Sequence, residues 1–421
     1  MARAPWIAWL ALALAALSIA GDYYAYDAIA PDAELLRRLH GLSQSQIGLL
    51  NAIFSLPNIP LSLVGGLFID RFGAARTALL TAGFGFVGAA LTAVGEPYGV
   101  MVFGRLIFGI GEETLLVALL AGIAQWFSAE AAALSMSLLF SFARVGSYLA
   151  DVSTRWAAPL YVQGWRPPLV LAAGLTGVSL VAAVGFLLID AHRPSRAATA
   201  SHRIEWRRLA SWDRSFWYIL GLNVLFASVF FPFRSTFAIE FFQDAKHRTL
   251  AQAGLINSWV FFAAIFATPV VGWIADRLGR RAALLSLGAA LMPVTFFLLG
   301  ATNISLWVST VLMGIAFSVI PAVIWPATAM LVEKGRLGTA YGLINVIQSL
   351  GMFAANYAAG WLNDVYRAGP GHPEGYGPML LLLGGLSVIG LLSTLALWRR
   401  ESGPGGHGLE RPSAAPALAA G

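Results

Sequence analysis

The chain has 421 residues, of which 58% are hydrophobic and only 11% are charged. Soluble proteins carry roughly a quarter charged residues, so this chain cannot cover a globule of its size with ions, which excludes a soluble enzyme. The formal net charge is +6 and cysteine is absent, which excludes disulfides, thiol catalysis and cysteine-ligated metals.

Apolar stretches bounded by charges, glycine or proline predict an all-α membrane protein with twelve transmembrane helices. A span needs about 20 apolar residues, and the chain is long enough for a dozen of them. In chain order the expected spans lie near 5–30, 45–70, 76–95, 99–126, 132–158, 167–190, 215–241, 250–276, 281–300, 304–331, 336–363 and 376–398.

Polar segments divide this series into parts. Residues 191–214 form the longest polar stretch between spans and predict a cytoplasmic linker. It separates an N-terminal six-helix half, 1–190, from a C-terminal six-helix half, 215–398. Residues 399–421 are rich in glycine, proline and alanine, which predicts a disordered cytoplasmic tail.

The basic residues indicate the orientation in the membrane. If the N-terminus is inside, seventeen Lys and Arg residues fall in cytoplasmic segments and six fall in outside loops. The positive-inside rule therefore predicts that both termini are cytoplasmic. Short basic clusters between spans are typical of this rule and do not indicate nucleic-acid binding. A composition rich in Ala, Gly and Arg indicates a bacterial protein, and hence the inner membrane.

One short motif occurs twice, 206 residues apart, so the two halves look like a duplication. The copies are Gly66-x-x-x-Asp70-Arg71-x-Gly73 after the second span and Gly272-x-x-x-Asp276-Arg277-x-Gly279-Arg280-Arg281 after the eighth. This pattern resembles the signature of the major facilitator superfamily, which implies a fold of two pseudo-symmetric six-helix halves. Its Asp can bind a helix N-terminus or a basic residue and release it when the halves rock. We interpret both copies as conformational gates.

The fourth span begins with Arg105-x-x-x-Gly109-x-Gly111, which resembles a second motif of the same superfamily. The spacing puts Arg105 and Gly109 on one helix face, one turn apart. A buried Arg here either organises polar contacts or takes part in proton coupling, as in related antiporters. We favour the first role and group Arg105 with the gating residues.

Charged residues inside the predicted spans are functional candidates, because a charge at the bilayer centre costs at least about 2.5–3.5 kcal/mol. Glu112, Glu113 and Arg144 lie nearest the midplane, counted from the predicted span ends. A glutamate and Arg144 either form an ion pair that joins two helices or bind the ammonium and carboxylate ends of a zwitterion. Adjacent Glu112 and Glu113 point about 100° apart, so one is expected to bind ligand and the other to pack against a partner.

Several patches resemble one branch of the superfamily, the major facilitator superfamily domain-containing protein 1 branch, whose members are lysosomal dipeptide carriers. They are Phe103 to Thr114, Gln125-Trp126-Phe127, Ala143 to Ser147, Tyr24-x-Tyr26-Asp27, Phe231-Pro232-Phe233, Trp325-Pro326, Gly338 to Gly342 and Ile347 to Gly351. The resemblance implies a dipeptide carrier that needs no ion gradient, with Glu113 and Arg144 as the ligand-binding pair. The lysosomal relative works with an accessory subunit, which nothing in this sequence supports.

Two residues depart from that branch. Glu112 stands where a Gly is usual and could be a proton site, whereas Arg234 is an additional charge that could favour anionic substrates. Polar and aromatic side chains at midplane depth would complete the binding site: Tyr26, Trp325, Tyr341, Asn345 and Gln348. The last three share one face of the eleventh span, although each alone could equally serve helix packing.

The sequence therefore predicts an alternating-access transporter of small zwitterionic solutes, most simply dipeptides, by uniport. One alternative is a proton-coupled antiporter or symporter of drugs or organic anions, with Asp22, Glu112 or Glu113 carrying the proton. Another is a receptor on a carrier scaffold that does not transport. The histidines lack metal-ligand spacing and no glycine loop precedes a Walker lysine, so no metal, cofactor or nucleotide is expected.

Overall fold

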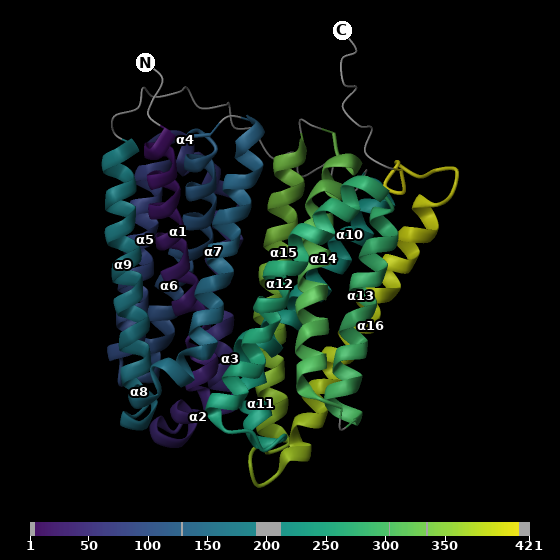
Figure 1. Cartoon of the computed structure of the whole chain (residues 1–421). Helices are drawn as coiled ribbons and strands as arrows, with labels where there is room; N and C mark the ends of the chain where they lie inside the picture. Colours follow the sequence, from purple (N-terminus) through teal and green to yellow (C-terminus); the bar gives the residue numbers. More distant parts are fainter. Residues whose placement is uncertain (1–4, 128, 191–211, 303, 334–335, 412–421) are drawn as a thin grey trace. The chain divides into compact units, whose positions relative to one another are not determined.

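The computed structural model describes residues 5–127, 129–190, 212–302, 304–333 and 336–411. For a few helical residues, Asp70 and Asp276 among them, it describes the backbone but not the side chain. The described chain is almost entirely helical, and the helices run as long rods (Figure 1). The fold class is therefore the all-α membrane architecture that the apolar stretches predict.

The N-terminal helices follow one another with short connections. Their bounds are α1 (Pro5–Asp27), α2 (Ile29–His40), α3 (Gln44–Ile53), α4 (Asn58–Phe72), α5 (Ala74–Val94), α6 (Tyr98–Ile123), α7 (Ala129–Trp156), α8 (Ala158–Gln163) and α9 (Arg166–Asp190). The second expected span is thus two helices, α3 and α4. The chain turns between them at 54–57, where Pro57 ends the turn and Pro60 lies in the first turn of α4, and proline disfavours a continuous helix.

The C-terminal helices include one irregular element. They are α10 (Arg214–Pro232), a π-helix (Phe233–Phe237), α11 (Ala238–Asp244), α12 (Leu250–Leu278), α13 (Arg281–Ala301), α14 (Leu306–Leu331), α15 (Leu337–Val365), a 3-10 helix (Pro373–Tyr376) and α16 (Gly377–Glu401). The seventh expected span therefore corresponds to α10, the π-helix and α11 together. π-helices are rare, and those that occur inside longer helices often lie at functional sites.

Ten helices in the described chain are long and apolar enough to cross a membrane, by length and composition. The two other expected spans correspond to α3 with α4, which is interrupted, and to α7, which carries several charged residues. Together these helices account for every span that the sequence predicts.

The chain forms two compact units, and the boundaries that fall within the described residues lie inside helices. The first contains Met1–Ser201, Phe231–Ser258 and Met352–Pro378, and the second contains His202–Phe230, Trp259–Gly351 and Met379–Gly421. The π-helix, α11, the start of α12 and the end of α15 therefore belong with the N-terminal helices. The division at the 191–214 linker stays a prediction from the sequence.

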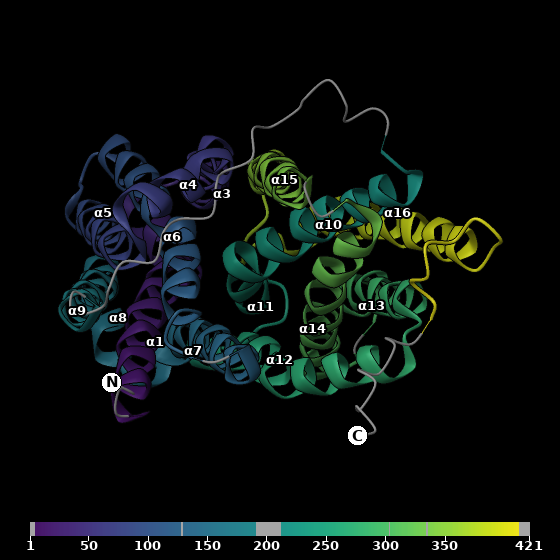
Figure 2. The same cartoon turned by 90° about the horizontal axis from the view of Figure 1, so that it is seen from above.

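Small residues allow close helix packing in the first unit. Helix α5 packs on α6 and α9, and α1 packs on α7 and α9 (Figure 2). Where α5 meets α6, a Cβ at Gly111 would lie 2.5 Å from the Thr81 carbonyl oxygen, and a Cβ at Gly104 would lie 2.7 Å from the Thr92 amide. These close approaches between membrane helices need glycine, and they fix the position of the charged residues on α6.

Candidate substrate site and gates

Three carboxylates gather in the interior of the first unit, and we call them the inner acidic cluster: Asp22 on α1, and Glu112 and Glu113 on α6. Asp22 and Glu112 are buried, whereas Glu113 is half-buried. The Glu112 carboxyl lies within electrostatic range of both other members. One oxygen of Asp22 and one of Glu112 have no hydrogen-bond partner, so these groups are available to bind a cation or a proton.

Arg105, about two turns before Glu112 and Glu113 on α6, is bound mainly by backbone. Its guanidinium donates to the carbonyl oxygens of Leu50 (3.2 Å), Ala25 (3.3 Å) and Tyr26 (3.2 Å), and to the Asn51 side-chain oxygen (2.7 Å). These contacts join α1, α3 and α6. The geometry is that of a residue that organises polar contacts, which leaves little of the guanidinium for a ligand.

Arg144 on α7 and Glu113 on α6 are both half-buried. Tyr23 on α1 lies within electrostatic range of Glu113 and Glu112, and Arg144 lies within electrostatic range of Tyr23. The two residues predicted to hold opposite ends of a zwitterion therefore lie around one tyrosine. The neighbours of Tyr23 on α6 and α7 are remote in the chain, so the sequence alone does not indicate that they meet.

Arg234 lies elsewhere, in the π-helix, where it forms what we call the Arg234 network with Asp27, Asp151 and Asn257. Its side chain is fully buried and forms ion pairs with Asp27 on α1 and with Asp151 on α7, the latter at 2.5 Å. Asn257 on α12 donates to the second oxygen of Asp151 (3.0 Å) and to the Arg234 carbonyl (3.1 Å). All four residues belong to the first unit, so this network ties C-terminal segments to N-terminal helices.

Tyr26 connects this network to the inner acidic cluster. Its ring contacts Phe54 (4.7 Å between ring centroids) and lies 6.4 Å from the ring of Phe231, next to the π-helix. Tyr26 also lies within electrostatic range of Glu112 and of Asp27. The predicted site residues Glu112, Glu113 and Tyr26 thus lie close together. Arg234 forms an ion pair with Asp27, the residue that follows Tyr26.

A second set of charges lies at the end of the first unit that carries α2, α3 and α11 (Figure 1). Arg37 on α2 forms an ion pair with Glu240 on α11 and lies 3.8 Å from Asp244. The Tyr376 hydroxyl donates to Asp244 (2.7 Å). Glu240 is fully buried and Asp244 is nearly so, whereas Arg37 is partly exposed, so this ion pair is only partly shielded from solvent.

The same end holds a contact between α3 and α15. Asp364 accepts hydrogen bonds from the backbone amides of Gln44 (2.8 Å) and Ser45 (2.7 Å), at the first turn of α3. A carboxylate is favourable at a helix N-terminus, where the amides are unpaired. A Cβ at Gly360 would collide with the Gln44 carbonyl. The α15 helix is thus held against α3 without intervening space.

The predicted residues of the eleventh span lie in the second unit. Tyr341, Asn345 and Gln348 are half-buried on α15. The Tyr341 hydroxyl donates to the Trp325 carbonyl (3.1 Å), and Gln348 accepts a hydrogen bond from Asn223 on α10 (2.7 Å). Asn223 is a polar partner that sequence reasoning missed, and only its amide type in an apolar span could have marked it.

The repeated motifs lie at helix junctions. Gly73 joins α4 to α5 with φ 82°, and Gly279 joins α12 to α13 with φ 67°, conformations that favour glycine. Arg71 is exposed, whereas Arg281 is buried. The Arg277 guanidinium lies over the Trp273 ring, 4.4 Å from its centroid. The backbone of Arg280 has a left-handed conformation. The side chains of Asp70 and Asp276 lie outside the described part of the chain, so their gating role stays a prediction.

Residues within the predicted tail make specific contacts in the second unit. The α16 helix extends to Glu401, Leu409 is fully buried, and its carbonyl accepts a hydrogen bond from the Arg281 amide (2.8 Å). Asp213 accepts from the Ser215 amide (2.7 Å) and forms an ion pair with Arg400 (2.6 Å). Burial opposes the charged form of Asp213, but these two hydrogen bonds outweigh it and lower the pKa of the carboxyl below its usual value.

A family model for the Major Facilitator Superfamily matches residues 12–244 and again 223–420, which together cover nearly the whole chain. The chain belongs to the Major Facilitator Superfamily. It is accordingly an integral membrane transporter and not an enzyme.

Several curated relatives carry the name lysosomal dipeptide transporter MFSD1. The Danio rerio protein is 29% identical over 361 residues, covering 82% of this chain and 78% of the relative. The Homo sapiens protein is 27% identical over 360 residues, covering 82% and 77%. A probable sulfoacetate transporter, SauU of Cupriavidus necator, is 23% identical over 400 residues, covering 86% and 87%. The chain thus resembles the MFSD1 branch.

Solved structures agree on the fold. The nucleoside transporter NupG matches with a TM-score of 0.76 and 12% identity, covering 92% of this chain and 99% of that one. A bacterial homolog to the human lysosomal transporter Spinster, inward-facing and unoccupied, matches with a TM-score of 0.74 and 14% identity, covering 94% and 98%. At these identities the likeness concerns the major facilitator fold alone.

Proposed function

We propose that this transporter carries dipeptides and similar small zwitterions across the membrane by alternating access, as a uniporter. The observation that carries the proposal is the placement of half-buried Glu113 and Arg144 around Tyr23 in the interior of the first unit. The resemblance to transporters named for dipeptides supports the same substrate class.

The charges suit the two ends of such a ligand. The Glu113 carboxylate would bind the ammonium group, and the planar Arg144 guanidinium would bind the carboxylate through two parallel hydrogen bonds. An extended dipeptide reaches about 7 Å, at roughly 3.3–3.6 Å for each residue, a distance that side chains on neighbouring helices can span. On the basis of the sequence we extend the proposal to Trp325, Tyr341, Asn345 and Gln348 as further ligand contacts.

Two gates would alternate around the ligand. The Arg234 network, with the Arg37–Glu240 ion pair, would hold the predicted outer side closed, because it joins segments of both halves through buried charges. The motifs around Asp70, Arg71 and Gly73 and around Asp276 and Arg277 would form the cytoplasmic gate, with Arg105 keeping α1, α3 and α6 in register. We further propose a bacterial inner-membrane location with both termini cytoplasmic, on the basis of the arginine distribution.

One observation favours a second candidate, proton-coupled transport of organic anions or drugs. The inner acidic cluster holds three carboxylates, while Arg105 is engaged mainly with backbone oxygens. A buried carboxylate without a full set of partners is stabilised by a proton. The likeness to a probable sulfoacetate transporter points to anionic substrates in the same way.

Uptake into proteoliposomes tests the proposal. A labelled dipeptide should enter vesicles containing the wild-type protein equally well with and without a pH gradient. Glu113→Gln and Arg144→Ala should each weaken apparent affinity by about 30-fold or more, since an unpaired charge at such a contact costs about 2–5 kcal/mol. Glu96→Gln is the matched control, because Glu96 is exposed and its only described ion pair, with Arg166, lies on the surface.

The alternatives give different results. Uptake that stops without a pH gradient would favour the proton-coupled candidate, in which Asp22, Glu112 or Glu113 carries the proton. Thermal stabilisation by dipeptides without any uptake would favour a receptor. Unchanged affinity in both Glu113→Gln and Arg144→Ala would show that the ligand binds elsewhere.

A further inference from the structure

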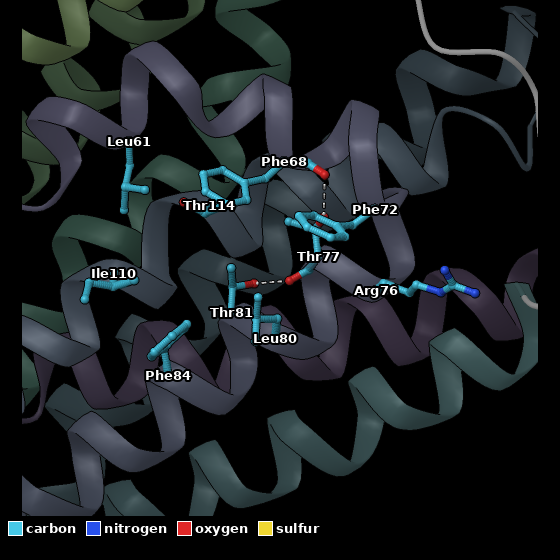
Figure 3. Close-up of a pocket in the computed structure, with 10 residues that line it drawn as sticks. All are labelled: Leu61, Phe68, Phe72, Arg76, Thr77, Leu80, Thr81, Phe84, Ile110 and Thr114. Carbon is cyan, nitrogen blue, oxygen red and sulfur yellow. Dashed lines mark hydrogen bonds between the residues drawn. The ribbon is translucent and has the colours of Figure 1, made fainter.

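A lateral groove of about 230 Å³ lies in the first unit between α4, α5 and α6. Its lining is almost entirely apolar, and Figure 3 shows aromatic and aliphatic side chains from the three helices pointing into it. The residues that matter to the argument are Phe68, Phe72, Arg76, Leu80, Phe84 and Ile110. None of the lining residues belongs to the inner acidic cluster or to the Arg234 network, and Thr114, which follows Glu113 on α6, is the lining residue next to the cluster in sequence.

The groove is not built for a polar solute. Two of its hydroxyls are already bonded to backbone: Thr77 donates to the Gly73 carbonyl (2.9 Å), and Thr81 donates to the Thr77 carbonyl (2.9 Å; Figure 3). Phe68 and Leu80 are exposed at its mouth. In a membrane, exposed apolar side chains of this kind contact acyl chains, which therefore match the lining chemically.

Positive charge lies at one end of this apolar surface. Arg76 is exposed at the start of α5 and extends away from Ile110 and Phe84, which lie at the other end of the group (Figure 3). Arg71 is also exposed, and its guanidinium lies over the ring of Phe72, 5.5 Å from the centroid. The eight residue-to-residue steps from Arg76 to Phe84 extend about 12 Å along the helix at 1.5 Å each. The groove is thus an elongated apolar slot with two arginines at its end.

We propose that this groove binds one anionic phospholipid. An acyl chain lies along Leu80 and Phe84, and the phosphate contacts Arg76 and Arg71, which offer planar donors matched to phosphate oxygens. Basic pockets between membrane helices select anionic headgroups by this chemistry. The bound lipid packs on the last turns of α4, which carry the first gate motif. This inference does not depend on which solute is transported.

The test compares lipids that share acyl chains and differ in headgroup. Purified full-length protein in neutral detergent is heated with phosphatidylglycerol, with phosphatidylcholine, or with inorganic phosphate. Phosphatidylglycerol should raise the Tm more than phosphatidylcholine, and inorganic phosphate should leave it unchanged. Arg71→Ala/Arg76→Ala should reduce the apparent phosphatidylglycerol affinity by about fivefold per arginine, down to the level of phosphatidylcholine. Arg399→Ala removes an exposed charge from α16 and should leave the difference intact.

A second variant tests the apolar slot. Leu80→Trp adds bulk at an exposed position that lines the groove, so it should fold normally and lower the number of both phospholipids retained in native mass spectrometry. The proposal is overturned if the two headgroups stabilise the wild-type protein equally. It is also overturned if the loss of Arg71 and Arg76 has no more effect than the loss of Arg399, or if phosphate alone reproduces the shift.

Discussion

Replacing Arg234 by Met should open the end of the first unit that the Arg234 network is proposed to hold closed. Arg234, Asp27 and Asp151 are all fully buried, so removing the cation leaves two carboxylates without their counter-charge. Removing one partner of a buried ion pair costs about 3–5 kcal/mol. If the network forms only in the closed state, about 3 kcal/mol of that cost shifts the open–closed equilibrium by roughly 150-fold.

Thiol labelling measures this shift directly, because the natural chain contains no cysteine. Ala253 is fully buried on α12, one turn before Asn257, so Ala253→Cys should react slowly with a membrane-impermeant maleimide in an otherwise wild-type background. Adding Arg234→Met should speed this reaction. Val162 on α8 is 88% exposed, so Val162→Cys serves as the reference, and its rate should be the same in both backgrounds.

A charge-neutral variant distinguishes gating from general damage. Asp27→Asn/Asp151→Asn/Arg234→Met removes every charge of the network, and replacing a whole buried ion-pair group is often neutral or stabilising. It should restore slow labelling at position 253. If Arg234→Met lowers the Tm but leaves the labelling rate unchanged, the network persists in both conformations and the gating argument is refuted.

Further predictions concern packing and pH. Gly254→Val should speed labelling in the same way as Arg234→Met, because any Cβ at Gly254 collides with the Asp151 carbonyl. Leu409→Ala should lower the free energy of unfolding by about 2–5 kcal/mol, as for a buried leucine. Thermal unfolding measures this effect, and an unchanged Tm would contradict the packing of this segment. The wild type should have a higher Tm than Asp213→Asn at neutral pH, because folding lowers the pKa of the Asp213 carboxyl and so favours its charged form. This difference in Tm should vanish as the pH falls below 3.8 and the carboxylate is protonated. An advantage that persists in acid would show that the ion pair is not its source.

The fold was predictable because each of its signals is local. The hydrocarbon core of a membrane favours long apolar segments, and the lack of water there forces their backbone into helices. The spans could therefore be recognised without knowledge of their neighbours. Glycine at 73 and 279 marked the helix junctions, where the structure needs positive φ. The recurrence of the motif indicated the superfamily, which the match over both halves confirms.

The site was predictable in type and only partly in arrangement. The cost of a charge in lipid singled out Glu112, Glu113 and Arg144 before any contact was known. The sequence grouped Arg234 with the substrate residues, whereas the structure places it between Asp27 and Asp151. Whether these residues bind a dipeptide stays a prediction.

The sequence by itself determined that the chain crosses a membrane, that it is a duplicated major facilitator protein, and which residue types must be shielded from lipid. Only the tertiary structure decided which charges meet. Asp27 and Arg234 are 207 positions apart, and they meet only through the packing of the π-helix against α1. Pairing between remote helices depends on how glycine contacts and helix rotations combine across the whole unit, and no single segment contains that information.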